Sequence, residues 1–97
     1  MVEREVRIVN RLGLHARAAA KFVQLAGTFS SRVRVARDGE AVDGKSILGL
    51  LLLAASQGQD VVLSCEGPDE PDALEQLVAL VERGFYEETE EEQQETA

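Results

Sequence analysis

The chemistry available to this chain centres on its single histidine, His15, two positions before Arg17 and at the start of a helical pattern. A neutral imidazole is a nucleophile near neutral pH, because its reference pKa is about 6.5. The first N–H groups of a helix have no partner within it, and the helix dipole makes that end positive. Such an end binds phosphate, and a guanidinium in the same turn adds a fixed cation. The segment therefore suggests a site for a phosphoryl group; the alternative is that His15 only caps the helix.

Seven elements must position this histidine. Alternating apolar residues predict strands at 2–9, 32–37, 40–42 and 60–66, and helical spacing predicts helices at 16–26, 46–55 and 69–83. Asp38-Gly39 favours a tight hairpin turn, and Ser46 is expected to cap the second helix. The order β-α-β-β-α-β-α predicts an α+β layered domain. The pattern leaves the strand order within the sheet open, and a ferredoxin-like sheet fits equally well.

Length and composition exclude several classes of protein. A chain of 97 residues with 44% hydrophobic residues has room for one core, and no apolar run is long enough to cross a membrane. No export leader is visible, so a cytoplasmic location is expected. The single cysteine, Cys65, excludes an internal disulfide and a cysteine-only metal cage. Neither zinc-ligand spacing nor a nucleotide-binding glycine motif occurs, so no metal and no cofactor is expected.

The net charge of −8 is unevenly distributed. Residues 1–45 hold nine basic and five acidic side chains, whereas residues 46–97 hold one basic and thirteen acidic ones. A basic half suggests an anionic ligand or partner. Nucleic acid is not favoured, because the whole chain is acidic and no aromatic residues alternate with the basic ones. Residues 87–97 form a glutamate-rich tail that is expected to be disordered, which leaves a domain of residues 1–86.

Two sequence motifs resemble those of a known family. The segment Gly13-Leu14-His15-Ala16-Arg17-Ala18-Ala19 resembles the active-site motif of the histidine-containing phosphocarriers, HPr and its nitrogen-system relative NPr. The segment Asp43-Gly44-Lys45-Ser46-Ile47-Leu48-Gly49-Leu50 resembles the regulatory-serine motif of that family. The resemblance continues in Gly67-Pro68-Asp69 and Glu82-Arg83-Gly84-Phe85, so it covers roughly residues 2–86 in the right order.

This resemblance implies a carrier of the phosphoenolpyruvate-dependent phosphotransferase system. Such proteins accept a phosphoryl group from phosphorylated enzyme I on Nδ1 of the histidine, here His15, and pass it to enzyme IIA-type proteins. Arg17 and the N–H groups of the turn from Ala16 to Ala18 are expected to stabilise the phosphoryl group. The implied fold is an open-faced β-sandwich, whose four-stranded antiparallel sheet has the order 1-4-2-3 and carries three helices on one side. A protein of this kind is a covalent substrate of its partners and not an enzyme with its own turnover, and we expect a monomer.

One residue departs from the family motif. Ala18 stands where the family usually has proline, and alanine leaves a helix-start N–H group available. Because alanine favours helix, we expect the turn to survive with a little more freedom.

The helix after Ser46 carries the remaining predictions. In some bacteria HPr kinase/phosphorylase phosphorylates the serine of this motif, and regulation at Ser46 is compatible with capping. The helix is apolar on all sides; Leu50, Leu53 and Ala54 are expected to face the sheet. Positions where the family docks enzyme I and IIA proteins match Ile47, Leu48 and Leu51, and the alternative is a thick local core. Leu52 adds a possible self-association surface.

Two other functions and the choice of pathway remain open at this stage. The chain could be a regulatory module that docks a transcription factor or a metabolic enzyme through the Ser46 helix, with His15 silent. It could also be a metabolite-binding domain of ferredoxin-like type. The motifs do not decide between sugar uptake and nitrogen-type regulation.

Overall fold

The computed structural model describes residues 1–87, so residues 88–97 of the predicted acidic tail lie outside the described residues. The elements follow the predicted order β-α-β-β-α-β-α, and a 3-10 turn follows the last helix. They are β1 (Val2–Arg7), α1 (Ala16–Ala26), β2 (Arg32–Arg37), β3 (Glu40–Asp43), α2 (Ile47–Leu53), β4 (Asp60–Glu66), α3 (Glu70–Glu82) and η1 (Gly84–Tyr86).

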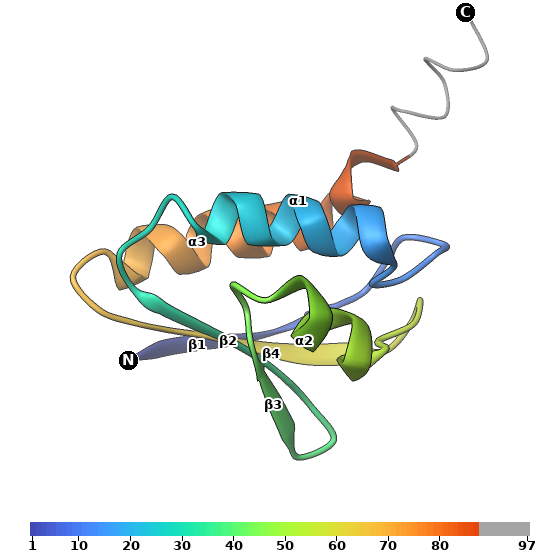
Figure 1. Cartoon of the computed structure of the whole chain (residues 1–97), viewed down its shortest axis with the longest axis horizontal. Helices are drawn as coiled ribbons and strands as arrows, with labels where there is room; N and C mark the ends of the chain where they lie inside the picture. Colours follow the sequence, from blue (N-terminus) through green and yellow to red (C-terminus); the bar gives the residue numbers. More distant parts are fainter. Residues whose placement is uncertain (88–97) are drawn as a thin grey trace, which may run out of the picture.

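The four strands form one antiparallel sheet in the order β1-β4-β2-β3. The three helices lie on one face of this sheet, with α1 and α3 side by side and the shorter α2 close to β3 (Figure 1). This arrangement confirms the open-faced sandwich and the strand order that the family resemblance implied.

Alternation within the strands places the core between the sheet and the helices. Val33 and Val35 are buried toward the helices, while Arg32 and Arg34 point to the open face. The face without helices is exposed to solvent, as is common for antiparallel sheets that pack only one side on the core. The helix α3 buries an apolar stripe, which includes Leu74, Leu77, Val78 and Val81.

The helix α2 is shorter than predicted. It ends at Leu53, because Ala54 adopts a left-handed conformation with φ of 54°. The guanidinium of Arg37 donates to the Leu53 carbonyl from Nε at 3.2 Å and from Nη2 at 3.0 Å, which satisfies a carbonyl that the helix end leaves without an internal partner. The prediction that Ala54 faces the sheet is wrong, because its left-handed conformation turns the chain. Ala54 is exposed, and Ala55 is buried in its place.

Asp69 ties the start of α3 to the loop before β2. Its carboxylate accepts hydrogen bonds from the backbone N–H of Ser30 at 2.8 Å and of Ser31 at 2.9 Å, and from the Ser31 hydroxyl. The hydrogen bond from the Ser31 hydroxyl, followed by the backbone bond from Ser30, holds the pKa of Asp69 below its usual value.

The chain reverses after α3 through three consecutive left-handed residues. Gly84, Phe85 and Tyr86 have φ angles of 65°, 56° and 61°. Two of these are not glycine, and each such residue costs on the order of 1 kcal/mol or more. Burial of the Phe85 ring and a 2.7 Å hydrogen bond from Lys21 Nζ to the Phe85 carbonyl offset that cost. The reversal carries the end of the described chain over the beginning of α1 (Figure 1).

Candidate functional site

His15 is the N-cap residue of α1, with extended backbone angles of φ −82° and ψ 179°. Its Nδ1 accepts a hydrogen bond from the backbone N–H of Arg17 at 3.3 Å, and its side chain is 27% exposed. Ala16 and Arg17 are exposed in the same turn, and Ala18 is buried. The structure therefore brings the imidazole and the predicted phosphate-binding turn together at the positive end of the helix.

A tight loop before His15 sets its position. Gly13 has a φ of 66°, and a Cβ atom at this position would lie 2.6 Å from the carbonyl oxygen of Ala55. The next residue, Leu14, donates its backbone N–H to that same carbonyl at 2.9 Å. Only glycine meets both conditions, since it accepts positive φ and has no Cβ to collide. The loop is thereby held against the segment that follows α2.

Glu87 is part of this site, although the sequence analysis assigned it to the tail and gave it no role. Its side chain is only 10% exposed, and its Oε1 contacts His15 Nε2. The same oxygen accepts a hydrogen bond from Asn10 Nδ2 at 3.0 Å. Asn10 is itself buried, and its Nδ2 also donates to the Gly13 carbonyl at 2.8 Å. No sequence signal distinguished Glu87 from the glutamates that follow it, because its burial depends on the reversal after α3.

Ser46 caps α2 as predicted, since its hydroxyl accepts the backbone N–H of Gly49 at 3.0 Å. The outward residues of this helix form an exposed apolar face. Ile47 is 42% exposed, Leu48 66%, Leu51 37% and Leu52 71%. These side chains are not a thick local core, because Leu50 and Leu53 alone are buried along the helix.

A further exposed apolar residue lies in the histidine loop. Leu12, which the sequence analysis did not select, is 59% exposed. The hydrogen bond from Leu14 to Ala55 places this loop beside the end of α2. The histidine loop and the exposed apolar face of α2 consequently belong to one end of the domain.

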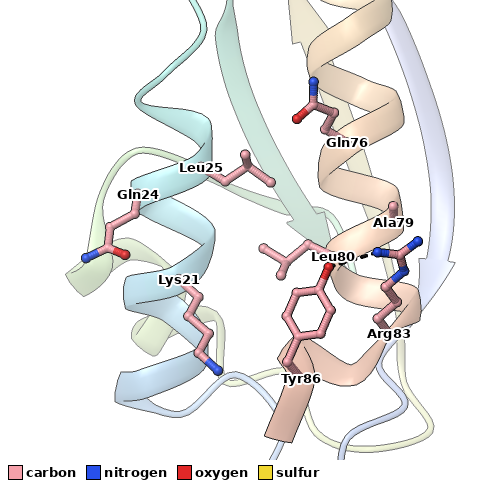
Figure 2. Close-up of a pocket in the computed structure, with 8 residues that line it drawn as sticks. All are labelled: Lys21, Gln24, Leu25, Gln76, Ala79, Leu80, Arg83 and Tyr86. Atoms are coloured by element: carbon pink, nitrogen blue, oxygen red, sulfur yellow. Dashed lines mark hydrogen bonds between the residues drawn. The ribbon is translucent and has the colours of Figure 1, made fainter. Parts of the chain in front are cut away.

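A separate shallow groove of about 540 Å³ lies between α1 and α3. Figure 2 shows Gln24 and Leu25 of α1 on one side and Gln76 and Leu80 of α3 on the other. Tyr86 closes one end, where its hydroxyl accepts a hydrogen bond from Arg83 at 3.0 Å. The groove is lined by neither His15 nor Ser46, so it lies outside the candidate site.

The single cysteine, Cys65, is fully buried on β4. Burial raises the pKa of its thiol, so it stays protonated and unreactive at neutral pH. Within residues 1–87, no cluster of three or more histidine, cysteine, aspartate or glutamate side chains could hold a metal ion. The described helices are also too short or too polar for any of them to cross a membrane.

Comparison with known proteins gives matches over nearly all of this domain. The family profile described as "PTS HPr component phosphorylation site" matches residues 2–83. The phosphocarrier protein HPr of Cupriavidus necator is 51% identical over 87 residues, which is 90% of this chain and 98% of that protein. The crystal structure of HPr-C-His from Thermoanaerobacter tengcongensis superposes with a TM-score of 0.87 at 49% identity, covering 90% of this chain and 98% of that one. A crystal structure of an HPr dimer from the same organism matches with a TM-score of 0.70 at 49% identity, covering 88% of this chain and 98% of that one.

Proposed function

The chain belongs to the HPr family of phosphocarriers, and we propose that His15 accepts a phosphoryl group from phosphorylated enzyme I and delivers it to enzyme IIA-type proteins. The observation that carries this proposal is the position of His15 Nδ1, which faces the backbone N–H of Arg17 at the start of α1. A phosphoryl group on Nδ1 replaces this weak contact, because its oxygens accept hydrogen bonds from the helix-start N–H groups.

Arg17 and the N–H groups of Ala16 and Ala18 stabilise the phosphoryl group in this proposal. Phosphoryl transfer passes through a loose transition state with charge spread over three oxygens, so fixed dipoles and a cation contribute most. The protein is then a covalent substrate that its partners load and unload, and it needs no cofactor of its own. It acts in the cytoplasm as a monomer, although the relatives include a dimer.

Docking and regulation are assigned to α2. The exposed side chains of Ile47, Leu48 and Leu51 form an apolar surface at the same end as His15, which suits a partner that must reach the imidazole. Phosphorylation of Ser46 by an HPr kinase/phosphorylase places an anion beside that surface, and an anionic partner is then repelled.

Incubation with phosphoenolpyruvate and a compatible enzyme I tests the proposal. We expect one added phosphate, labile to acid and stable to base, that is absent from the His15→Ala variant. Arg17→Ala should slow the transfer, whereas Arg34→Ala on the open face of the sheet should not. Lys21→Ala is unsuitable as a control, because Lys21 anchors the Phe85 carbonyl.

The exposed apolar face supports a second candidate, a regulatory module that docks a partner through α2 while His15 remains silent. Absence of any mass increment in the wild-type chain, with enzyme I active on another carrier, would favour that module over the carrier.

A further inference from the structure

We propose that Glu87 is a positioning residue that keeps the proton of neutral His15 on Nε2, so that Nδ1 presents its lone pair for phosphoryl transfer. This inference rests on the proposed function of His15 and adds a residue that the active-site motif does not contain.

The first observation is the set of contacts around the carboxylate. Glu87 Oε1 contacts His15 Nε2 and also accepts from Asn10 Nδ2 at 3.0 Å. An ionised carboxylate is only an acceptor, so a close contact with an imidazole nitrogen is favourable when that nitrogen carries a proton. The carboxylate therefore selects the ring form with hydrogen on Nε2, because the hydrogen bond at one ring nitrogen decides the state of the other.

The second observation comes from the opposite side of the ring. His15 Nδ1 receives the backbone N–H of Arg17 at 3.3 Å, which requires a lone pair and not a proton on Nδ1. The backbone of α1 and the side chain of Glu87 thus favour the same tautomer from two sides.

The third observation is how firmly the fold holds Glu87. Asn10 must turn its Nδ2 toward Glu87 and the Gly13 carbonyl, since both are acceptors, and the two bonds are 3.0 Å and 2.8 Å long. The left-handed turn with the buried Phe85 ring delivers Glu87 to the imidazole, and Lys21 fixes the Phe85 carbonyl from α1. Strained backbone persists only where the surrounding structure enforces it, and it concentrates at functional sites.

The proposed chemistry balances without another reactant. The Nδ1 lone pair forms the new bond to phosphorus while the bond from phosphorus to the donor breaks, and the donor atom leaves with that electron pair. The Nε2 proton stays on the ring, which becomes cationic as Nδ1 is phosphorylated. Glu87 then faces a positive N–H group, and a charge-assisted hydrogen bond of this kind is stronger than a neutral one.

Nitrogen-15 NMR of His15 in the free protein tests the tautomer without any partner, at a pH high enough that the ring shifts no longer change with pH and the neutral form is observed. We expect the wild-type ring to carry hydrogen on Nε2 and Glu87→Ala to give a mixture of both forms. Glu87→Gln should keep the wild-type form, since an amide oxygen still accepts the Nε2 proton. Glu82→Gln removes the same charge from the exposed end of α3 and should change nothing.

Rates of phosphoryl transfer to His15 distinguish the effect of Glu87 on the tautomer from the effect of its negative charge. Glu87→Ala should slow phosphorylation by at least about 10-fold, consistent with loss of a hydrogen bond to a charged group. Glu87→Gln should be intermediate, because it keeps the tautomer and loses the charge. Thermal melts of each variant show whether the domain remains folded at the temperature of the assay.

Three results would overturn the inference. One is hydrogen on Nδ1 in the wild-type ring, and another is an unchanged tautomer in a folded Glu87→Ala variant. The third is faster transfer in Glu87→Ala, which would mean that the carboxylate repels the incoming phosphoryl group. If the wild-type chain accepts no phosphate at all, the proposed function fails, while the NMR result still reports on the role of Glu87.

Discussion

Replacement of Gly13 by alanine tests the account of the histidine loop. The residue has a φ of 66°, and its added Cβ would lie 2.6 Å from the Ala55 carbonyl oxygen and 3.0 Å from Ser56 Cα. An alanine in the left-handed region costs about 1–2 kcal/mol. The collision is with backbone, so it cannot be relieved by rotating a side chain. A forced shift of a packed segment costs about 1–3 kcal/mol more.

Gly39→Ala provides a matched control. Gly39 has a φ of 85° in the turn between β2 and β3, and nothing lies within 4 Å of an added Cβ. Its replacement should cost only the conformational part, about 1–2 kcal/mol. The difference between the two variants then isolates the collision at Ala55.

Urea denaturation followed by circular dichroism measures both free energies of unfolding. We expect Gly13→Ala to lose about 2–5 kcal/mol, and to lose at least about 1 kcal/mol more than Gly39→Ala. Phosphorylation of His15 should also slow in Gly13→Ala alone, because the imidazole follows the loop. Equal losses of stability in the two variants would refute the reasoning, since the collision of the added Cβ with the Ala55 carbonyl would then not contribute to the free energy of unfolding.

Three further perturbations test other parts of the structure. Ser46→Asp should change stability by less than about 1 kcal/mol, since aspartate also caps a helix, but should weaken binding of enzyme I in calorimetric titration; unchanged affinity would contradict docking on α2. Phe85→Ala should cost about 3–5 kcal/mol in urea denaturation, because it removes a fully buried ring, and a smaller loss would mean that the turn relaxes. Asp69 has a lowered pKa, so its stabilisation is present above the ordinary value of about 3.9 and is lost as the pH falls through the lowered value. Melts of Asp69→Asn at pH 7 and in acid should therefore show a lower midpoint at pH 7 and a smaller loss on acidification than in the wild type, whereas parallel curves would contradict this.

The sequence predicted the elements well where local pattern and packing agree. The bounds of α1, β2 and β4 match the predictions, because apolar periodicity and turn residues mark the same limits. The prediction for α2 extended two residues too far. No local sequence signal shows that Ala54 adopts a left-handed conformation or that the guanidinium of Arg37 in β2 binds the Leu53 carbonyl at the helix end. The strand order came from family resemblance, as periodicity does not determine which strands are neighbours.

The candidate site also contains residues that local motifs predict and residues that only the tertiary fold brings together. His15, the turn that follows it and the Ser46 cap lie within short motifs, so their residue types and the family resemblance together pointed to them. Glu87 meets His15 across 72 positions of sequence and Asn10 across 77, and both contacts depend on the path of the chain after α3. A surface residue in a glutamate run and a buried carboxylate beside an imidazole look identical in sequence.

The pairing of β1 with β4 affects the order in which parts of the chain fold during synthesis. Val2 lies opposite Cys65 and Arg7 opposite Asp60, so the first strand has no partner until most of the chain has left the ribosome. Closing so long a loop is slow compared with forming a helix or the β2–β3 hairpin. The histidine loop follows directly after β1 and needs Ala55 to hold it in place. A nascent or truncated chain can therefore contain the complete histidine motif before the loop is in place, and the proposed phosphoryl transfer requires the finished domain.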